Sequence, residues 1–180
     1  RDRLRSRGLG DVYKRQMYNL SYWSSWSNGF NIWKSEFDKI DKNLKLNKLF
    51  PHTSLFLTQH QAKLFCINDN LLFDVQRIPK RGGHNKFEAF TIEYPSLLDE
   101  CCKKGHISTK CKKHILFGIM VQFLPSLLFN KYIIRIETFD DTGFRNNLKK
   151  YYPSYAYWLV LISVLGVPFR LFCRKLKNKR

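Results

Sequence analysis

Two cysteines and two histidines lie close together in the chain, with the spacing Cys102-x3-His106-x4-Cys111-x2-His114. Thiolate sulfur and imidazole nitrogen are the donors that tetrahedral zinc prefers, and four of them complete its shell. The spacing departs from that of standard zinc knuckles, and the neighbouring lysines are equally typical of a basic connector. These four residues are therefore the candidate zinc ligands, with a solvated connector that carries reduced cysteines as the alternative.

A second motif could do acid–base chemistry. The string Asp141-Thr142-Gly143 matches the active-site loop of aspartic proteases literally. Those enzymes need two aspartates that share one proton, and the sequence has no second Asp-Thr-Gly or Asp-Ser-Gly. The motif is also an ordinary turn sequence. We therefore predict no catalytic residues and expect the protein not to be an enzyme, with an aspartic hydrolase as a remote alternative.

The elements before residue 114 predict a small soluble α+β region over residues 17–113. Apolar residues at helical spacing predict an amphipathic helix over 31–49, and its apolar face is a candidate surface for protein partners. That face carries Trp33, Phe37, Ile40 and Leu44.

Short runs rich in strand-forming residues follow the predicted helix. They lie at 54–58, 63–67, 72–76 and 86–94, and turn residues separate them. They predict an antiparallel meander of four strands. A further half-buried strand is expected at 131–139, within a connecting segment over 131–150.

Residues 151–173 predict a transmembrane helix. No charged side chain occurs from Tyr155 to Phe169, aromatic residues gather at the N-terminal end, and basic residues crowd the other end. Residues 114–130 are a weaker candidate because the apolar run is short and contains Pro125. The sequence of that segment is compatible with a kinked span, a re-entrant segment or a helix of the soluble fold. The positive-inside rule places the basic tail, residues 174–180, in the cytoplasm.

Residues 1–16 resemble one reading frame through the transposon-end adapter used to prepare DNA libraries, because Asp11 to Gln16 reads back as that end sequence. We therefore expect this segment to be foreign and the native N-terminus to be missing. Leaving out its six basic and two acidic residues lowers the formal net charge from +18 to +14. This charge favours an anionic membrane surface as partner, and nucleic acid ranks below it.

The C-terminal segment also carries a family resemblance. Trp158 is followed by Pro168 and Arg170, which is similar to the final span of the transmembrane protein 151 family, where an apolar Trp-Leu run ends in Trp-Pro-Leu-Arg. Here residues 167–170 read Val-Pro-Phe-Arg, so the Trp of that motif is absent. The resemblance covers about a dozen residues. It implies a multi-pass membrane protein with no known catalytic residues.

Together these features predict a fragment of an integral, non-catalytic membrane protein that serves as a scaffold, a trafficking factor or a subunit of a membrane complex. The lipid bilayer is the expected partner, through an anionic cytoplasmic leaflet that faces the basic tail. The alternative is a soluble basic module that binds nucleic acid and holds zinc.

Overall fold

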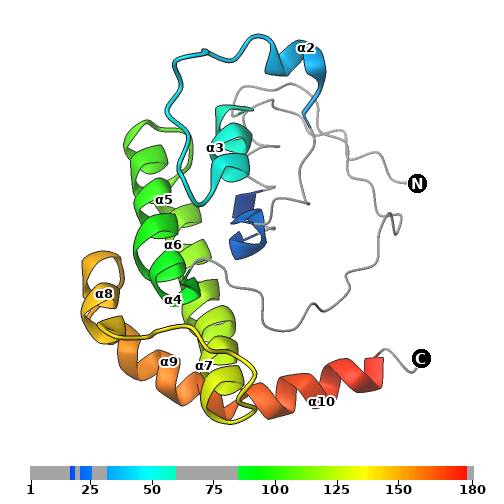
Figure 1. Cartoon of the computed structure of the whole chain (residues 1–180), viewed down its shortest axis with the longest axis vertical. Helices are drawn as coiled ribbons and strands as arrows, with labels where there is room; N and C mark the ends of the chain where they lie inside the picture. The colour runs from blue at the N-terminus through cyan, green and yellow to red at the C-terminus, as the bar shows by residue number, and fades with distance from the viewer. Residues whose placement is uncertain (1–16, 19–20, 26–31, 60–84, 178–180) are drawn as a thin grey trace.

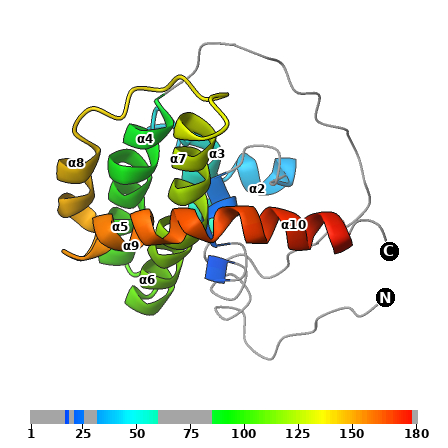
Figure 2. The same ribbon diagram turned by 90° about the horizontal axis from the view of Figure 1, so that it is seen from below.

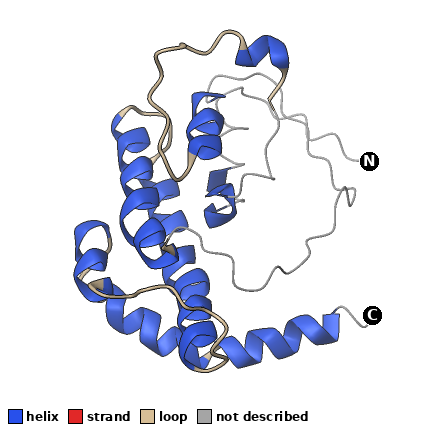
Figure 3. Cartoon of the chain, viewed as in Figure 1, coloured by secondary structure: helices blue, strands red, loops and turns tan. Residues whose placement is uncertain are grey.

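The computed structural model describes residues 17–18, 21–25, 32–59 and 85–177, and over these residues the chain forms helices joined by turns, without a β-strand (Figures 1 and 3). The elements are η1 (Ser21–Ser25), α2 (Lys34–Phe37), α3 (Pro51–Thr58), α4 (Lys86–Glu88), η4 (Ala89–Glu93), α5 (Tyr94–Lys103), α6 (Thr109–Gly118), η5 (Ile119–Phe123), α7 (Leu124–Tyr132), α8 (Phe144–Tyr151), α9 (Ala156–Leu165) and α10 (Val167–Lys177). The predicted α+β fold is therefore wrong for this part of the chain, which is helical.

The strand predicted over 86–94 is the first half of a long helix formed by α4, η4 and α5. Asn85 begins it, because its side-chain oxygen accepts hydrogen bonds from the backbone N–H groups of Phe87 and Glu88. Phe87, Phe90 and Tyr94 are buried at helical spacing. A short run of apolar and aromatic residues is compatible with a strand or a helix, and the Asn85 cap favours the helix.

The other predicted strands have different outcomes. Residues 54–58 lie in α3, where Pro51 occupies the first turn, a position at which its missing N–H is not needed. Residues 63–67 and 72–76 lie outside the described residues. The segment 131–139 is not a strand, because α7 continues to Tyr132 and the chain then runs on without ladder partners.

The helix predicted over 31–49 is reduced to the single turn α2. Trp33 and Phe37 are 69% and 48% exposed, so the first half of the apolar stripe is largely uncovered by the described residues. Beyond α2 the Asp41 carboxylate accepts a hydrogen bond from the backbone N–H of Asn43. Local bonds of this kind stabilise turns in competition with the helix.

The apolar segment predicted over 114–130 belongs to one continuous helix from Thr109 to Tyr132, formed by α6, η5 and α7. It is long and apolar enough to cross a membrane, and half of its most apolar stretch of residues is buried inside the protein. Pro125 does not end it, because the π-helical turn η5 precedes the proline and absorbs the change in backbone register.

The core lies where the two long helices pack side by side and α8 and α9 close over them (Figures 1 and 2). Tyr94, Ile119, Leu124 and Val160 are fully buried there. Gly118 allows η1 to approach α6, since a Cβ at this position would lie 2.7 Å from the Ser21 hydroxyl oxygen.

The segment predicted as a straight transmembrane helix over 151–173 is divided and bent. Helices α9 and α10 meet at Gly166 with a bend of 49°, and the pair passes the length and apolarity test for a span only when taken together. We call this pair, residues 156–177, the C-terminal arm. Its α9 half packs on η5 and α7, and α10 runs on away from the other helices (Figure 1).

Candidate functional site

The candidate zinc ligands lie at the connection between α5 and α6, and their side chains have separate surroundings. Cys111 is buried, and the His114 ring stacks on Tyr18 with 3.8 Å between ring centroids. The Cys102 sulfur lies 3.6 Å from the Thr109 hydroxyl oxygen. Within the described residues, no group of three or more His, Cys, Asp or Glu side chains is arranged to hold a metal ion. His106 lies in the turn after α5 and completes no such group.

One candidate ligand, Cys111, is also poorly suited to metal binding as it stands. Burial raises the pKa of the Cys111 thiol to about 11, with a smaller contribution from the nearby Cys102. Zinc binds the thiolate form, so a thiol with this pKa is protonated near neutral pH. A zinc site here would therefore require the end of α5 and the start of α6 to rearrange.

The Asp-Thr-Gly string forms a structural turn between α7 and α8. The Asp141 carboxylate lies 2.6 Å from the Lys131 amine and also accepts a hydrogen bond from the Tyr132 hydroxyl. Burial raises the pKa of Asp141, but the bonds from Lys131 and Tyr132 outweigh it, and the net pKa is lowered. Asp140 accepts bonds from the backbone N–H and hydroxyl of Thr142. Asp141 thus ties this turn to the end of α7, and Asp140 stabilises the turn itself.

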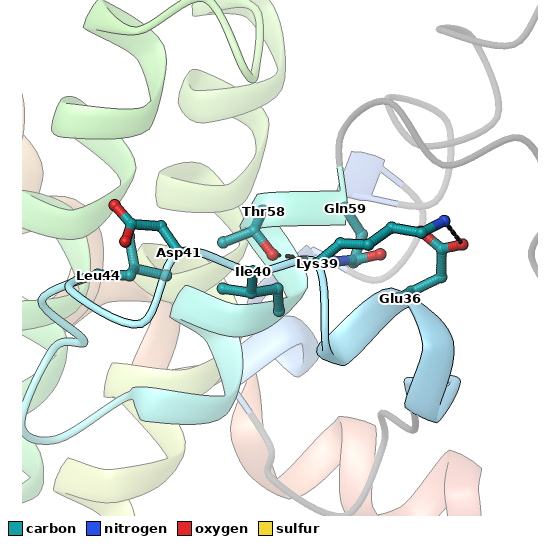
Figure 4. Close-up of a pocket in the computed structure, with 7 residues that line it drawn as sticks. All are labelled: Glu36, Lys39, Ile40, Asp41, Leu44, Thr58 and Gln59. Carbon is teal, nitrogen blue, oxygen red and sulfur yellow. Dashed lines mark hydrogen bonds and ion pairs between the residues drawn. The ribbon is translucent and has the colours of Figure 1, made fainter.

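A shallow cavity of about 490 Å³ lies between the turns after α2 and the end of α3 (Figure 4). Its wall combines an ion pair between Lys39 and Glu36, 2.8 Å apart, with the apolar side chains of Ile40 and Leu44. The ion pair is exposed, and exposed pairs of this kind contribute little energy. Nothing in this wall suggests a specific chemistry.

Prolines interrupt both long helices at equivalent places. Pro95 follows η4 and Pro125 follows η5, each with one residue between. A proline has no N–H and its ring clashes with the carbonyl four residues earlier. Widening to a π-helical turn relieves the clash and leaves a backbone carbonyl without its usual donor.

Donors from the C-terminal part of the chain reach these carbonyls. The Tyr152 hydroxyl donates to the Phe90 carbonyl at 2.6 Å, and the Arg170 guanidinium donates to the Val121 carbonyl. Burial raises the pKa of Tyr152 well above its ordinary value, so its hydroxyl remains a donor. Arg170 also donates to the Ser163 carbonyl at 3.4 Å and so ties α10 both to α9 and to η5.

The sequence interpretation missed both π-helical turns and the side chains that bond to them, although the sequence carries a signal for the turns. The tetrapeptide Pro-Ser-Leu-Leu occurs at 95–98 and again at 125–128. Each copy follows a π-helical turn, and its leucines are buried. The repeated tetrapeptide therefore indicates that the two long helices contain the same local structure.

The C-terminal arm carries a long row of exposed apolar side chains. Its members recur at intervals of four and three residues, as one face of a helix requires. We call them the exposed stripe: Trp158, Ile162, Leu165, Phe169, Phe172 and Leu176, each between 52% and 81% exposed. Contiguous apolar surface of this kind marks a site of membrane or protein contact.

The arm is also basic. Arg170 lies on α10, Arg174, Lys175 and Lys177 follow it in the sequence, and Asp141 is the last acidic residue of the chain. At the start of α9 the Arg145 guanidinium lies 5.2 Å from the Tyr157 ring centroid and 5.9 Å from that of Trp158. The exposed stripe is thus accompanied by positive charge at both ends.

Comparisons with protein-family models, with curated proteins and with solved structures find no match to this chain, so the resemblance to the transmembrane protein 151 family stays a prediction.

Proposed function

We propose that the chain is part of an integral, non-catalytic membrane protein and that the C-terminal arm is its main contact with the bilayer. One observation carries the proposal: Ile162, Leu165 and Phe169 are at least 66% exposed, and no described residue covers them. Leaving several large apolar side chains in water is unfavourable by about 25 cal/mol per Å². Insertion among lipid chains removes that cost.

The helix from Thr109 to Tyr132 supports the same location in a different way. It passes the length and apolarity test for a span, yet half of its apolar window packs within the bundle. The arm is therefore the part that presents apolar surface outward. The basic residues of the arm favour the cytoplasmic side, because Lys and Arg are enriched on that side of membranes.

The non-catalytic assignment rests on how the polar groups are used. Asp141 bonds to Lys131 and Tyr132, and Asp99 bonds to Lys103 and Lys112. These groups hold helices together, and the described residues contain no cavity in which they converge. A scaffold, a trafficking factor or a subunit of a membrane complex fits this arrangement best.

Fractionation of cells that express the tagged full chain tests the proposal. We expect the protein in the membrane pellet after a high-salt wash and after alkaline carbonate. A variant with Leu165→Ser and Phe169→Ser should move toward the soluble fraction. The matched control Phe117→Ser, which changes an exposed phenylalanine on α6, should stay in the pellet. Recovery of the unmodified chain in the soluble fraction before any wash would overturn the proposal.

A further inference from the structure

We propose that the C-terminal arm lies in the plane of an anionic leaflet, with the exposed stripe turned into the lipid, and does not cross the bilayer. This inference rests on the proposed membrane function and specifies how the arm meets the lipid. It follows from the length of the uncharged run, the arrangement of charge along α10 and the contacts of Arg170.

The uncharged part of the arm is too short to cross. It runs from Ala156, where α9 begins, to Phe169, which is 14 residues. At 1.5 Å per residue this is about 21 Å of helix, against a hydrocarbon core of about 30 Å. The next residue is Arg170, so a crossing helix would draw a guanidinium into the hydrocarbon.

The pattern on α10 is that of an interfacial helix. Phe169, Phe172 and Leu176 share one face, and they are 71%, 59% and 52% exposed. Along the sequence of α10, basic residues alternate with this apolar set, and Arg170 directly follows Phe169. A basic helix with an exposed apolar face settles with its axis in the interface plane and its apolar face about 5–10 Å deep.

Arg170 holds the bend that such a position needs. Its guanidinium donates to the Val121 carbonyl on η5 and to the Ser163 carbonyl on α9. Straightening the arm into one span would take the Arg170 donor from both carbonyls. Ser163 would keep the bond from the Gly166 N–H, but Val121 would lose its side-chain donor, which is unfavourable for a partly buried carbonyl. The bend of 49° therefore belongs to the folded protein.

The positive charge of the C-terminal part of the chain determines which kind of lipid surface it favours. After Asp141 the sequence contains nine basic residues and no acidic one. Basic residues near an anionic leaflet each contribute attraction, and a zwitterionic surface offers none of it. The partner that fits is therefore a bilayer containing anionic lipid. A second copy of the chain would be as positively charged as the first and would repel this face.

Vesicle flotation of the purified full chain tests the charge. We expect binding to vesicles of phosphatidylcholine with phosphatidylserine to exceed binding to phosphatidylcholine alone by about tenfold or more, and to weaken with salt. Arg174→Gln with Lys177→Gln should remove most of that difference. The matched control Lys149→Gln with Lys150→Gln changes two basic residues on α8, outside the arm, and should remove less.

The stripe is tested in the same assay. Phe169→Ser with Phe172→Ser should abolish flotation, whereas Leu171→Ser should not, because helical spacing places this exposed leucine off the stripe. If the unmodified chain self-associates in solution, and the Phe169→Ser and Phe172→Ser variant is monomeric, a second copy covers the stripe and the proposal fails.

The depth of residue 162 in the bilayer distinguishes an arm that lies in the plane of the leaflet from an arm that crosses the bilayer. A fluorophore on Ile162→Cys, in a Cys66→Ser, Cys102→Ser and Cys173→Ser background that keeps only the buried Cys101 and Cys111 thiols, should be quenched best by lipids that carry a quencher near the headgroup. Stronger quenching from the bilayer midplane would show a crossing helix and overturn the in-plane position, while the membrane function would stand. Equal flotation with both vesicle types would overturn the anionic partner alone. Failure to bind any vesicle or cell membrane would overturn the membrane function itself.

Discussion

Removing the Arg170 guanidinium should destabilise the protein because it leaves the Val121 carbonyl without that donor. The Arg170→Met variant keeps most of the apolar stem and removes the charge. A hydrogen bond with a charged partner contributes about 1.5–3 kcal/mol, and this one is partly buried between α10 and η5. We expect the free energy of unfolding to fall by about that amount.

The loss should depend on Pro125. In an unbroken α-helix the N–H of residue 125 would bond to the Val121 carbonyl, and proline has none. In a Pro125→Ala background that N–H is restored, so Val121 has a donor within its own helix. Arg170→Met should then cost less by about 1 kcal/mol or more, which is the size of coupling expected for groups that share one acceptor.

The assay is thermal unfolding of the full chain in mild detergent, followed by far-ultraviolet circular dichroism. Four proteins complete the cycle: the unmodified chain, both single variants and the double variant. Lys150→Met, which removes an exposed charge on α8, controls for the change in net charge. An equal loss from Arg170→Met in both backgrounds would refute the role given to Pro125. No loss in either would refute the hydrogen bond.

Three further outcomes follow from the described contacts. Tyr152→Phe should lower the free energy of unfolding by about 1–3 kcal/mol, because the buried Phe90 carbonyl loses its side-chain donor; an unchanged melting temperature would contradict this. The Lys112 and Lys103 amines lower the pKa of Asp99, so its stabilisation is present above the unfolded pKa of about 4 and is lost as pH falls through the lower folded value. The Asp99→Asn variant should therefore lose less stability on acidification than the unmodified chain, and parallel melting profiles against pH would count against the ion pairs. Leu148→Ala should cost about 2–5 kcal/mol in the same melts, because this side chain is 1% exposed, and a loss below 1 kcal/mol would mean that α8 is not packed as described.

Several features of the fold were readable from local sequence, and others were not. The apolar C-terminal segment and the basic residues after it are properties of composition and length, and the structure places a helical pair there. The predicted strands were wrong within the described residues because short apolar runs fit either element. At 86–94 the decisive residue was Asn85, whose cap lies just before the run. At 31–49 only the single turn α2 is helical despite correct apolar spacing, and the Asp41 carboxylate bonds within the turn that follows.

The sequence by itself therefore determined where apolar and basic residues concentrate, and with that which helices are long and apolar enough to cross a membrane. Only the tertiary structure decided how Pro95 and Pro125 are tolerated inside long helices. The side-chain donors to the carbonyls of the two π-helical turns, Tyr152 and Arg170, lie 62 and 49 residues away from their acceptors. Such pairings depend on the packing of distant helices, which no local periodicity encodes. The same packing divides the predicted span at Gly166 and sets the direction of the arm.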